Sequence, residues 1–230
     1  MTDSHRLPLL RFAAEGLLIV VSILSALAVD TFWSARQDRR LEREELQGIQ
    51  EQLETTKAQL EGTIRADESL LSWTERLLAV LEASGDGRAP VLDSLLRAQG
   101  GTTMFVAPLS RFDALLASGR LVLIEDPDLR AAIAQWPTLV GEVTEVAVRR
   151  RDFYETEFLA QLRDRYDLNH FLGAEPPIGN VTEIPVNDAF RNLVRERRFF
   201  DRVLLARERR LLEQLEGLLD RVRQALPESA

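Results

Sequence analysis

The 230-residue chain contains no cysteine and only two histidines, His5 and His170. Without cysteine there are no disulfides, no thiol catalysis and no cysteine-based zinc site. A metal site would have to combine His170 with nearby acids such as Asp164, Asp167 or Glu175, and a serine hydrolase would need His170 as its base. No Gly-x-Ser-x-Gly motif is present. We therefore predict no catalytic residue, no metal, no cofactor and no enzymatic activity.

Glycine and proline are also scarce, with 12 and 9 residues that cluster in a few places. The long stretches between them are rich in leucine, alanine, glutamate, arginine and glutamine, which are strong helix formers. This composition predicts an all-α fold. The net charge of −8 argues against nucleic-acid binding, which requires a positive surface.

Residues 12–33, FAAEGLLIVVSILSALAVDTFW, contain the longest apolar run. As a helix these 22 residues would be roughly 33 Å long, close to the thickness of a bilayer's hydrocarbon core. Glu15 and Asp30 bracket the run, and Phe32 and Trp33 suit the interfacial aromatic belt. The segment predicts a single transmembrane anchor, with these four residues near the headgroup layers and the lipid bilayer as a partner.

Two other interpretations of this segment stay open. It resembles a cleavable signal peptide, with Arg6 and Arg11 as the basic region, Leu17–Leu24 as the apolar region, and Ala26-Leu27-Ala28 as the cleavage site. It could also be a core helix that is buried on every side, because it has no polar stripe.

Orientation is ambiguous from the residues alone. Arg36, Arg39, Arg40 and Arg43 outnumber the basic residues of the short N-terminal tail, and the positive-inside rule then favours a cytoplasmic C-terminal domain. A short basic tail before one apolar helix is, however, the usual form of an anchor that exports the C-terminal part of its chain.

After the anchor, residues 34–84 carry leucine and isoleucine at spacings of three, four and seven, which predicts a long helix with coiled-coil character. A break at 85–90 precedes short helices at 91–98 and 109–118, the second ending at Gly119. Residues 121–124 suggest an extended segment. Asp126-Pro127 should begin a long helix that reaches about Tyr166.

A long loop, 167–187, then leads to a last helix that is capped by Asn187 or Asp188 and reaches about Leu226. We thus divide the chain into a tail (1–11), the anchor (12–33), a helical domain (34–226) and a C-terminal tail (227–230). The anchor helix should continue into the first long helix, and this should pack with the two other long helices and the short ones as an antiparallel bundle.

Two stretches are similar to a bacterial single-pass inner-membrane family with a domain of unknown function. In the first, the matching positions are Glu15, Leu17–Ala28, Asp30 and Trp33, although the order Glu15-Gly16 reverses the family's Gly-Glu. The second is FDALLASGRLVLIEDPDLRAAIAQW, residues 112–136, which resembles a Leu-x-x-Ser-Gly-x-Leu block before a helix. The resemblance implies an inner-membrane protein with an exported, periplasmic domain, and implies no activity.

The 112–136 block and the 167–187 loop supply our candidate partner surface, in which the block places Arg111, Arg120 and Arg130 near Trp136. Together these features predict a membrane-anchored interaction or scaffold protein, which associates with itself or with another envelope protein. The alternative is a sensory or ligand-binding module with a polar pocket near residues 105–136.

Overall fold

The computed structural model describes residues 6–83, 89–163 and 187–226, and the described side chains begin at Leu18. Its elements are α1 (Arg6–Glu82), α2 (Ala89–Arg97), α3 (Ser110–Ala117), the 3₁₀ helix η1 (Arg120–Leu123), α4 (Pro127–Phe153), the π turn η2 (Tyr154–Phe158), α5 (Leu159–Arg163) and α7 (Asp188–Ala225). All regular structure within the described ranges is helical, which confirms the all-α prediction.

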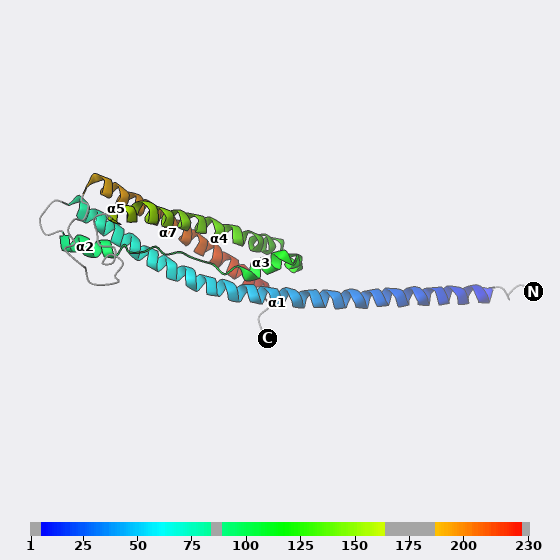
Figure 1. The fold of residues 1–230 in the computed structure, drawn as a ribbon. Helices are drawn as coiled ribbons and strands as arrows, with labels where there is room; N and C mark the ends of the chain where they lie inside the picture. The colour runs from blue at the N-terminus through cyan, green and yellow to red at the C-terminus, as the bar shows by residue number, and fades with distance from the viewer. Residues whose placement is uncertain (1–5, 84–88, 164–186, 227–230) are drawn as a thin grey trace, which may run out of the picture.

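The C-terminal half of α1, together with α4 and α7, forms an elongated bundle, while the N-terminal half of α1 projects from it alone (Figure 1). Helix α7 packs along both other long helices. It runs antiparallel to α1 and α4, whereas α1 and α4 run in the same direction (Figure 1). Among the three long helices, α1 and α4 are therefore the parallel pair, and α7 is antiparallel to both.

The antiparallel register of α1 and α7 is visible in a ladder of ion pairs that repeats every seven residues. Its pairs are Glu82–Arg195, Glu75–Arg202, Glu68–Arg209 and Glu54–Arg223, with nitrogen–oxygen distances of 2.7, 2.5, 2.7 and 3.0 Å. A seven-residue spacing keeps each pair on the seam between two helices that coil around each other. The coiled-coil pattern predicted for residues 34–84 thus has α7 as its partner.

One step of this ladder would place two acids, Glu61 and Glu216, opposite each other. Lys57, the chain's only lysine, lies between them. Its Nζ is 2.6 Å from Glu216 and 3.8 Å from Glu61. Hydrogen bonding to Glu216 raises the pKa of Lys57 above its usual value. The lysine therefore removes the repulsion that the heptad pattern would otherwise create.

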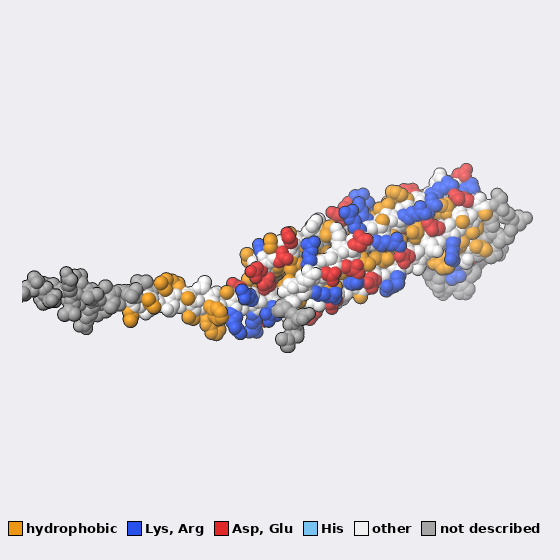
Figure 2. Space-filling model, turned by 180° about the vertical axis from the view of Figure 1, so that it is seen from behind, with side chains coloured by type: hydrophobic (Ala, Val, Ile, Leu, Met, Phe, Trp, Pro, Cys, Tyr) orange, Lys and Arg blue, Asp and Glu red, His pale blue; other side chains and the backbone are white. Residues whose placement is uncertain are grey.

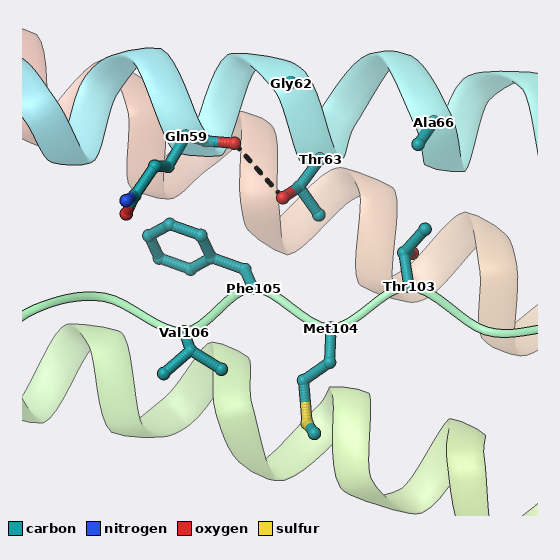
Figure 3. Close-up of a pocket in the computed structure, with 8 residues that line it drawn as sticks. All are labelled: Gln59, Gly62, Thr63, Ala66, Thr103, Met104, Phe105 and Val106. Atoms are coloured by element: carbon teal, nitrogen blue, oxygen red, sulfur yellow. Dashed lines mark hydrogen bonds between the residues drawn. The ribbon is translucent and has the colours of Figure 1, made fainter.

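The parallel pairing of α1 with α4 requires the chain to travel back along α1 between them. Helix α2, an extended segment (101–109) and α3 make this return, as contacts of Thr74 with Gln99 and of Gln52 with Arg111 show. The extended segment then lies between α1 and α4 (Figure 3). A connection of this length allows two consecutive long helices to be parallel.

Two apolar cores fill the bundle. The larger one surrounds Leu53, Trp136 and Leu215, and the smaller one surrounds Leu77, Phe158 and Phe190. Between them, the buried positions of α1, α4 and α7 carry polar and charged side chains. The bundle therefore has a polar layer that separates two hydrophobic clusters.

Between Leu18 and Trp33, the described side chains of the projecting helix are mostly apolar, and all of them are exposed. Large apolar side chains between Leu18 and Trp33 are 53–70% exposed. Among the residues that the structure describes, however, no helix reaches the length and apolarity that a membrane crossing requires. The predicted anchor, 12–33, includes 12–17, 19 and 20, whose side chains lie outside the described set, so the anchor stays a prediction.

Most local predictions for the rest of the chain are confirmed. Gly119 ends α3 with a φ of +70°, and Asp126 caps α4 by accepting from the backbone N–H groups of Asp128 and Leu129. Asn187 caps α7 in the same way through Phe190. The extended segment predicted at 121–124 is wrong, because η1 forms there. The loop 167–187 lies, apart from Asn187, outside the described residues.

The heptad ladder predicts which positions of α1 and α7 can be linked covalently. In the full-length chain, cysteines replacing Glu75 and Arg202 should react with a bis-maleimide crosslinker of about 10 Å, close to the usual distance between packed helices. Replacing Glu75 and Arg209 moves one thiol by two helical turns, about 10 Å further along the axis, and should give little product. Electrophoretic mobility after crosslinking measures both, and equal yields would contradict this register.

Candidate functional site: a buried ion cluster

The predicted anchor residues occupy the projecting helix. Asp30 and Trp33 are exposed, as is Phe32. The side chain of Glu15 lies outside the described set. No contact with the bundle is recorded for Asp30, Phe32 or Trp33, so within the described chain this part of α1 has no protein neighbour.

The predicted partner surface lies at the end of the bundle nearest the projecting helix. Its arginines make contacts within the chain. Arg120 forms an ion pair with Glu45 at 2.9 Å. Arg130 donates to the backbone oxygens of Ile124 and Glu125, and the guanidinium of Arg111 lies against Gly48. A Cβ at residue 48 would lie 2.7 Å from this guanidinium, so a larger residue there would require the Arg111 side chain to shift.

Trp136 is only 1% exposed, so its assignment to a partner surface is wrong. Its ring packs 6.2 Å from that of Phe112, inside the larger core. An aromatic side chain of this size gains more by filling the bundle than by lying on its surface. Phe105, Phe112 and Ile133 are likewise buried. A hollow that is open at the surface lies within the 105–136 region and is lined by Asp126, Asp128, Gln135 and Arg221, so the pocket expected for a sensory module stays a prediction.

The polar layer is centred on Arg150 of α4, which is 2% exposed. Its Nη1 lies 2.5 Å from a carboxylate oxygen of Asp67 on α1 and 3.4 Å from one of Asp201 on α7. Its Nη2 donates to the backbone and side-chain oxygens of Thr103 in the extended segment, at 2.5 and 2.8 Å. One guanidinium thus joins the three long helices to the connection between α1 and α4.

A second buried arginine, Arg197, lies one helical turn before Asp201. Its Nε is 3.9 Å from the Asp201 carboxylate, and its Nη2 donates to the backbone oxygen of Gly101 at 3.0 Å. The guanidinium also lies 4.7 and 4.9 Å from the ring centres of Tyr154 and Phe158. The π turn at the end of α4 carries both rings, and their faces stabilise the cation where water is absent.

Asp201 has a third neighbour, Thr74, whose hydroxyl lies 3.1 Å from its second carboxylate oxygen. The same hydroxyl is 3.0 Å from the amide oxygen of Gln99, which connects α2 to the cluster. Burial raises the pKa of the Asp201 carboxyl, while Arg197 and Arg150 act in the opposite direction. The carboxylate has several partners because an ion in this interior is stable only when it is paired and hydrogen-bonded.

Glu208 of α7 completes the cluster and differs from the other acids. It is fully buried, and neither carboxyl oxygen has a hydrogen-bond partner. Burial, with the nearby charge of Asp67, raises its pKa from 4.5 to about 8, although Arg150 acts to lower it. At neutral pH the Glu208 carboxyl is therefore mostly protonated. A protonated carboxyl can donate to the second oxygen of Asp67, which also lacks a partner.

The charges of this layer balance only when Glu208 is neutral. Two arginines face two aspartates, and the protonated glutamate adds no charge. The five side chains, Arg150, Arg197, Asp67, Asp201 and Glu208, are each at most 2% exposed. In this arrangement the groups bind one another rather than a molecule from solution. Among the described residues no group of histidines and acids is placed to hold a metal ion.

A signal for this cluster was present in the sequence. Asp67 interrupts the apolar stripe of α1, Arg150 that of α4, and Glu208 that of α7. Charged residues at core positions of three helices predict a shared polar layer, because each would be costly to bury alone. The sequence-based predictions did not group these residues, since their helices are distant along the chain.

A shallow groove lies beside the cluster, between α1 and the extended segment (Figure 3). Its volume is about 520 Å³, and its lining includes Gly62, Ala66, Met104 and Val106. A Cβ at Gly62 would contact only the tip of Arg65, so the small residues leave this face of α1 open. Met104 and Val106 are exposed at its edge.

Comparison with known proteins adds no relative. No family model, curated protein or solved structure matches the chain. The resemblance described from the sequence therefore stays a prediction.

Removing Arg150 should destabilise the bundle strongly. The substitution Arg150→Met leaves Asp67 without its cation, which should lower the free energy of unfolding by about 3–5 kcal/mol. Adding Asp67→Asn should restore part of this loss, because one unpaired carboxylate disappears. Urea unfolding of the full chain in non-ionic detergent measures both. The neighbouring Arg149→Met, which removes an exposed pair with Glu145, is the control and should cost at most about 0.5 kcal/mol.

Glu208 should make stability depend on pH. Because its folded pKa is above the unfolded value, its stabilising contribution is complete below pH 4.5 and is lost as pH rises towards 8. The slope should reach at most about 1.4 kcal/mol per pH unit. Glu208→Gln should flatten the dependence of the unfolding free energy on pH between pH 5 and 8. The substitution of the exposed Glu213 by glutamine should leave that dependence unchanged. Identical curves for wild type and Glu208→Gln would contradict a raised pKa.

Proposed function

We propose that this protein is a membrane-tethered helical scaffold, in which the N-terminal part of α1 is the anchor and the bundle is an interaction domain. The observation that supports the anchor is the exposure of large apolar side chains on every side of a lone helix. Such a surface is unfavourable in water and favourable in lipid. The transition to charged residues after Trp33 marks where the helix would leave the bilayer.

The shape of the molecule fits a tether. Helix α1 continues without interruption from Arg6 to Glu82, so the anchor and the bundle share one backbone (Figure 1). The bundle begins near Leu46, the first buried residue among the described side chains of α1, about 20 Å of helix beyond Trp33. A continuous helix would hold the bundle close to the membrane and aligned with the anchor.

The interaction role rests on the chemistry of the bundle. Its buried ions are paired with one another, and its arginine–glutamate ladder closes the seam between α1 and α7. These interactions make a rigid rod with a charged surface (Figure 2). We propose that this rod associates with a second copy or with another envelope protein.

Two sequence signals disagree about which side of the membrane holds the bundle. The resemblance implies a periplasmic bundle, whereas the arginines after Trp33 favour the cytoplasm. We propose that the bundle lies in the periplasm. Protease added to spheroplasts should then digest a C-terminal tag while the inner membrane is sealed, and protection of the tag until detergent is added would overturn this placement.

The anchor is tested by placing charges in it. In bacterial cells the full-length chain should remain in the membrane pellet after alkaline carbonate washing. Leu24→Arg combined with Leu27→Arg should release it, because each arginine costs roughly 2.5–3.5 kcal/mol at the centre of a membrane helix. The matched control carries Val122→Arg and Phe199→Arg, at exposed apolar positions of the bundle, and should stay in the pellet. Release of the wild-type chain by carbonate would refute the anchor.

A further inference from the structure

Four arginines lie on one face of α1 where it leaves the bundle: Arg36, Arg39, Arg40 and Arg43. Their spacing of three, one and three residues places them within an arc of about 100° on a helix of 3.6 residues per turn. All four are exposed. Figure 2 shows basic side chains gathered where the lone helix meets the bundle. We call this the arginine face.

The acids of the same segment lie mostly on the opposite side of the helix. Helical geometry places Asp38, Glu42 and Glu45 there, and two of them bind the bundle. Glu42 accepts from the backbone N–H of Glu125 at 2.7 Å, and Glu45 pairs with Arg120. The segment has as many acids as arginines, so its charge is separated by face rather than in net excess.

The arginine face is little neutralised from within the chain. Arg40 pairs with Glu44 at the edge of the face, at 2.9 Å. The structure shows no ion pair between Arg36, Arg39 or Arg43 and any residue that it describes. The seam with α7 is different, because there the arginines of the ladder are each paired with a glutamate. The other three arginines of the face are therefore available for an anionic ligand.

The placement of the arginine face at the membrane surface depends on the proposed anchor. If Trp33 lies at the membrane interface, Arg36, Arg39 and Arg40 are about 4.5, 9 and 10.5 Å further along the helix axis. A headgroup layer is about 5–7 Å deep, and arginine side chains can extend back towards it. Arg43 reaches the same layer when the helix tilts towards this face.

We propose that the arginine face binds anionic phospholipid headgroups beside the anchor. The planar guanidinium suits this ligand because it forms two parallel hydrogen bonds to one phosphate. A membrane is favoured over an acidic protein as the partner because the face continues directly from the apolar helix. Each arginine near an anionic surface should strengthen the preference for anionic lipid by up to roughly fivefold.

The test uses Trp33 as a reporter of the lipids around it. Full-length protein is placed in vesicles of equal parts phosphatidylcholine and phosphatidylglycerol, with brominated acyl chains on one lipid or the other. Bromine quenches a tryptophan that it contacts, and a Trp33→Phe variant gives the background from Trp73 and Trp136. Stronger quenching by brominated phosphatidylglycerol is expected, with a several-fold preference that decreases at high salt.

Replacing all four arginines of the face by glutamine should reduce this preference to near unity. The matched control replaces four exposed arginines elsewhere, Arg65, Arg207, Arg210 and Arg221, and should keep it. Equal quenching by both lipids in the wild type would overturn the arginine proposal but leave the anchor in place, and would turn the search towards an acidic protein. No quenching by either lipid would overturn the anchor itself, and the lipid site with it.

Discussion

The burial of Arg150 is the constraint on which the rest of the bundle depends. A guanidinium cannot lose its charge at ordinary pH, so it must be surrounded by acceptors wherever it is buried. Here those acceptors come from Asp67 on α1, Asp201 on α7 and Thr103 on the returning segment. Sliding any one of these elements along its neighbours would leave an unpaired ion in the interior. The polar layer therefore specifies the register of four chain segments at once.

The two apolar cores provide stability but little such specificity. Leucine side chains on α1 and α7 would pack almost as well after a shift of one heptad, because the stripe repeats itself. The polar layer between the cores does not repeat, and the ion-pair ladder along the seam has one irregular step, where Lys57 joins Glu61 and Glu216. Both features act against shifted arrangements. They contribute more to selecting one helix register than to the free energy of folding.

The same helix that carries Asp67 into this layer also carries the apolar segment and the arginine face. From Leu18 onward, α1 changes from mostly apolar and exposed, to charged with opposite signs mostly on opposite faces, to apolar on one stripe. Each pattern suits a different environment: lipid, the membrane–water boundary and a protein interior. One uninterrupted backbone therefore connects the three proposed environments.

The amino-acid sequence alone predicted most of the helices, because local signals are sufficient for them: Asp126-Pro127 begins α4, Gly119 ends α3, and Asn187 caps α7. It also indicated the apolar segment and the heptad stripe. The packed structure was needed to show that α1 and α4 are parallel, that Trp136 is core rather than surface, and that Asp67, Arg150, Asp201 and Glu208 meet. These outcomes depend on contacts between residues far apart in the chain. A single sequence records that a core position is charged, but the partner that makes the charge tolerable is known only once the helices are packed.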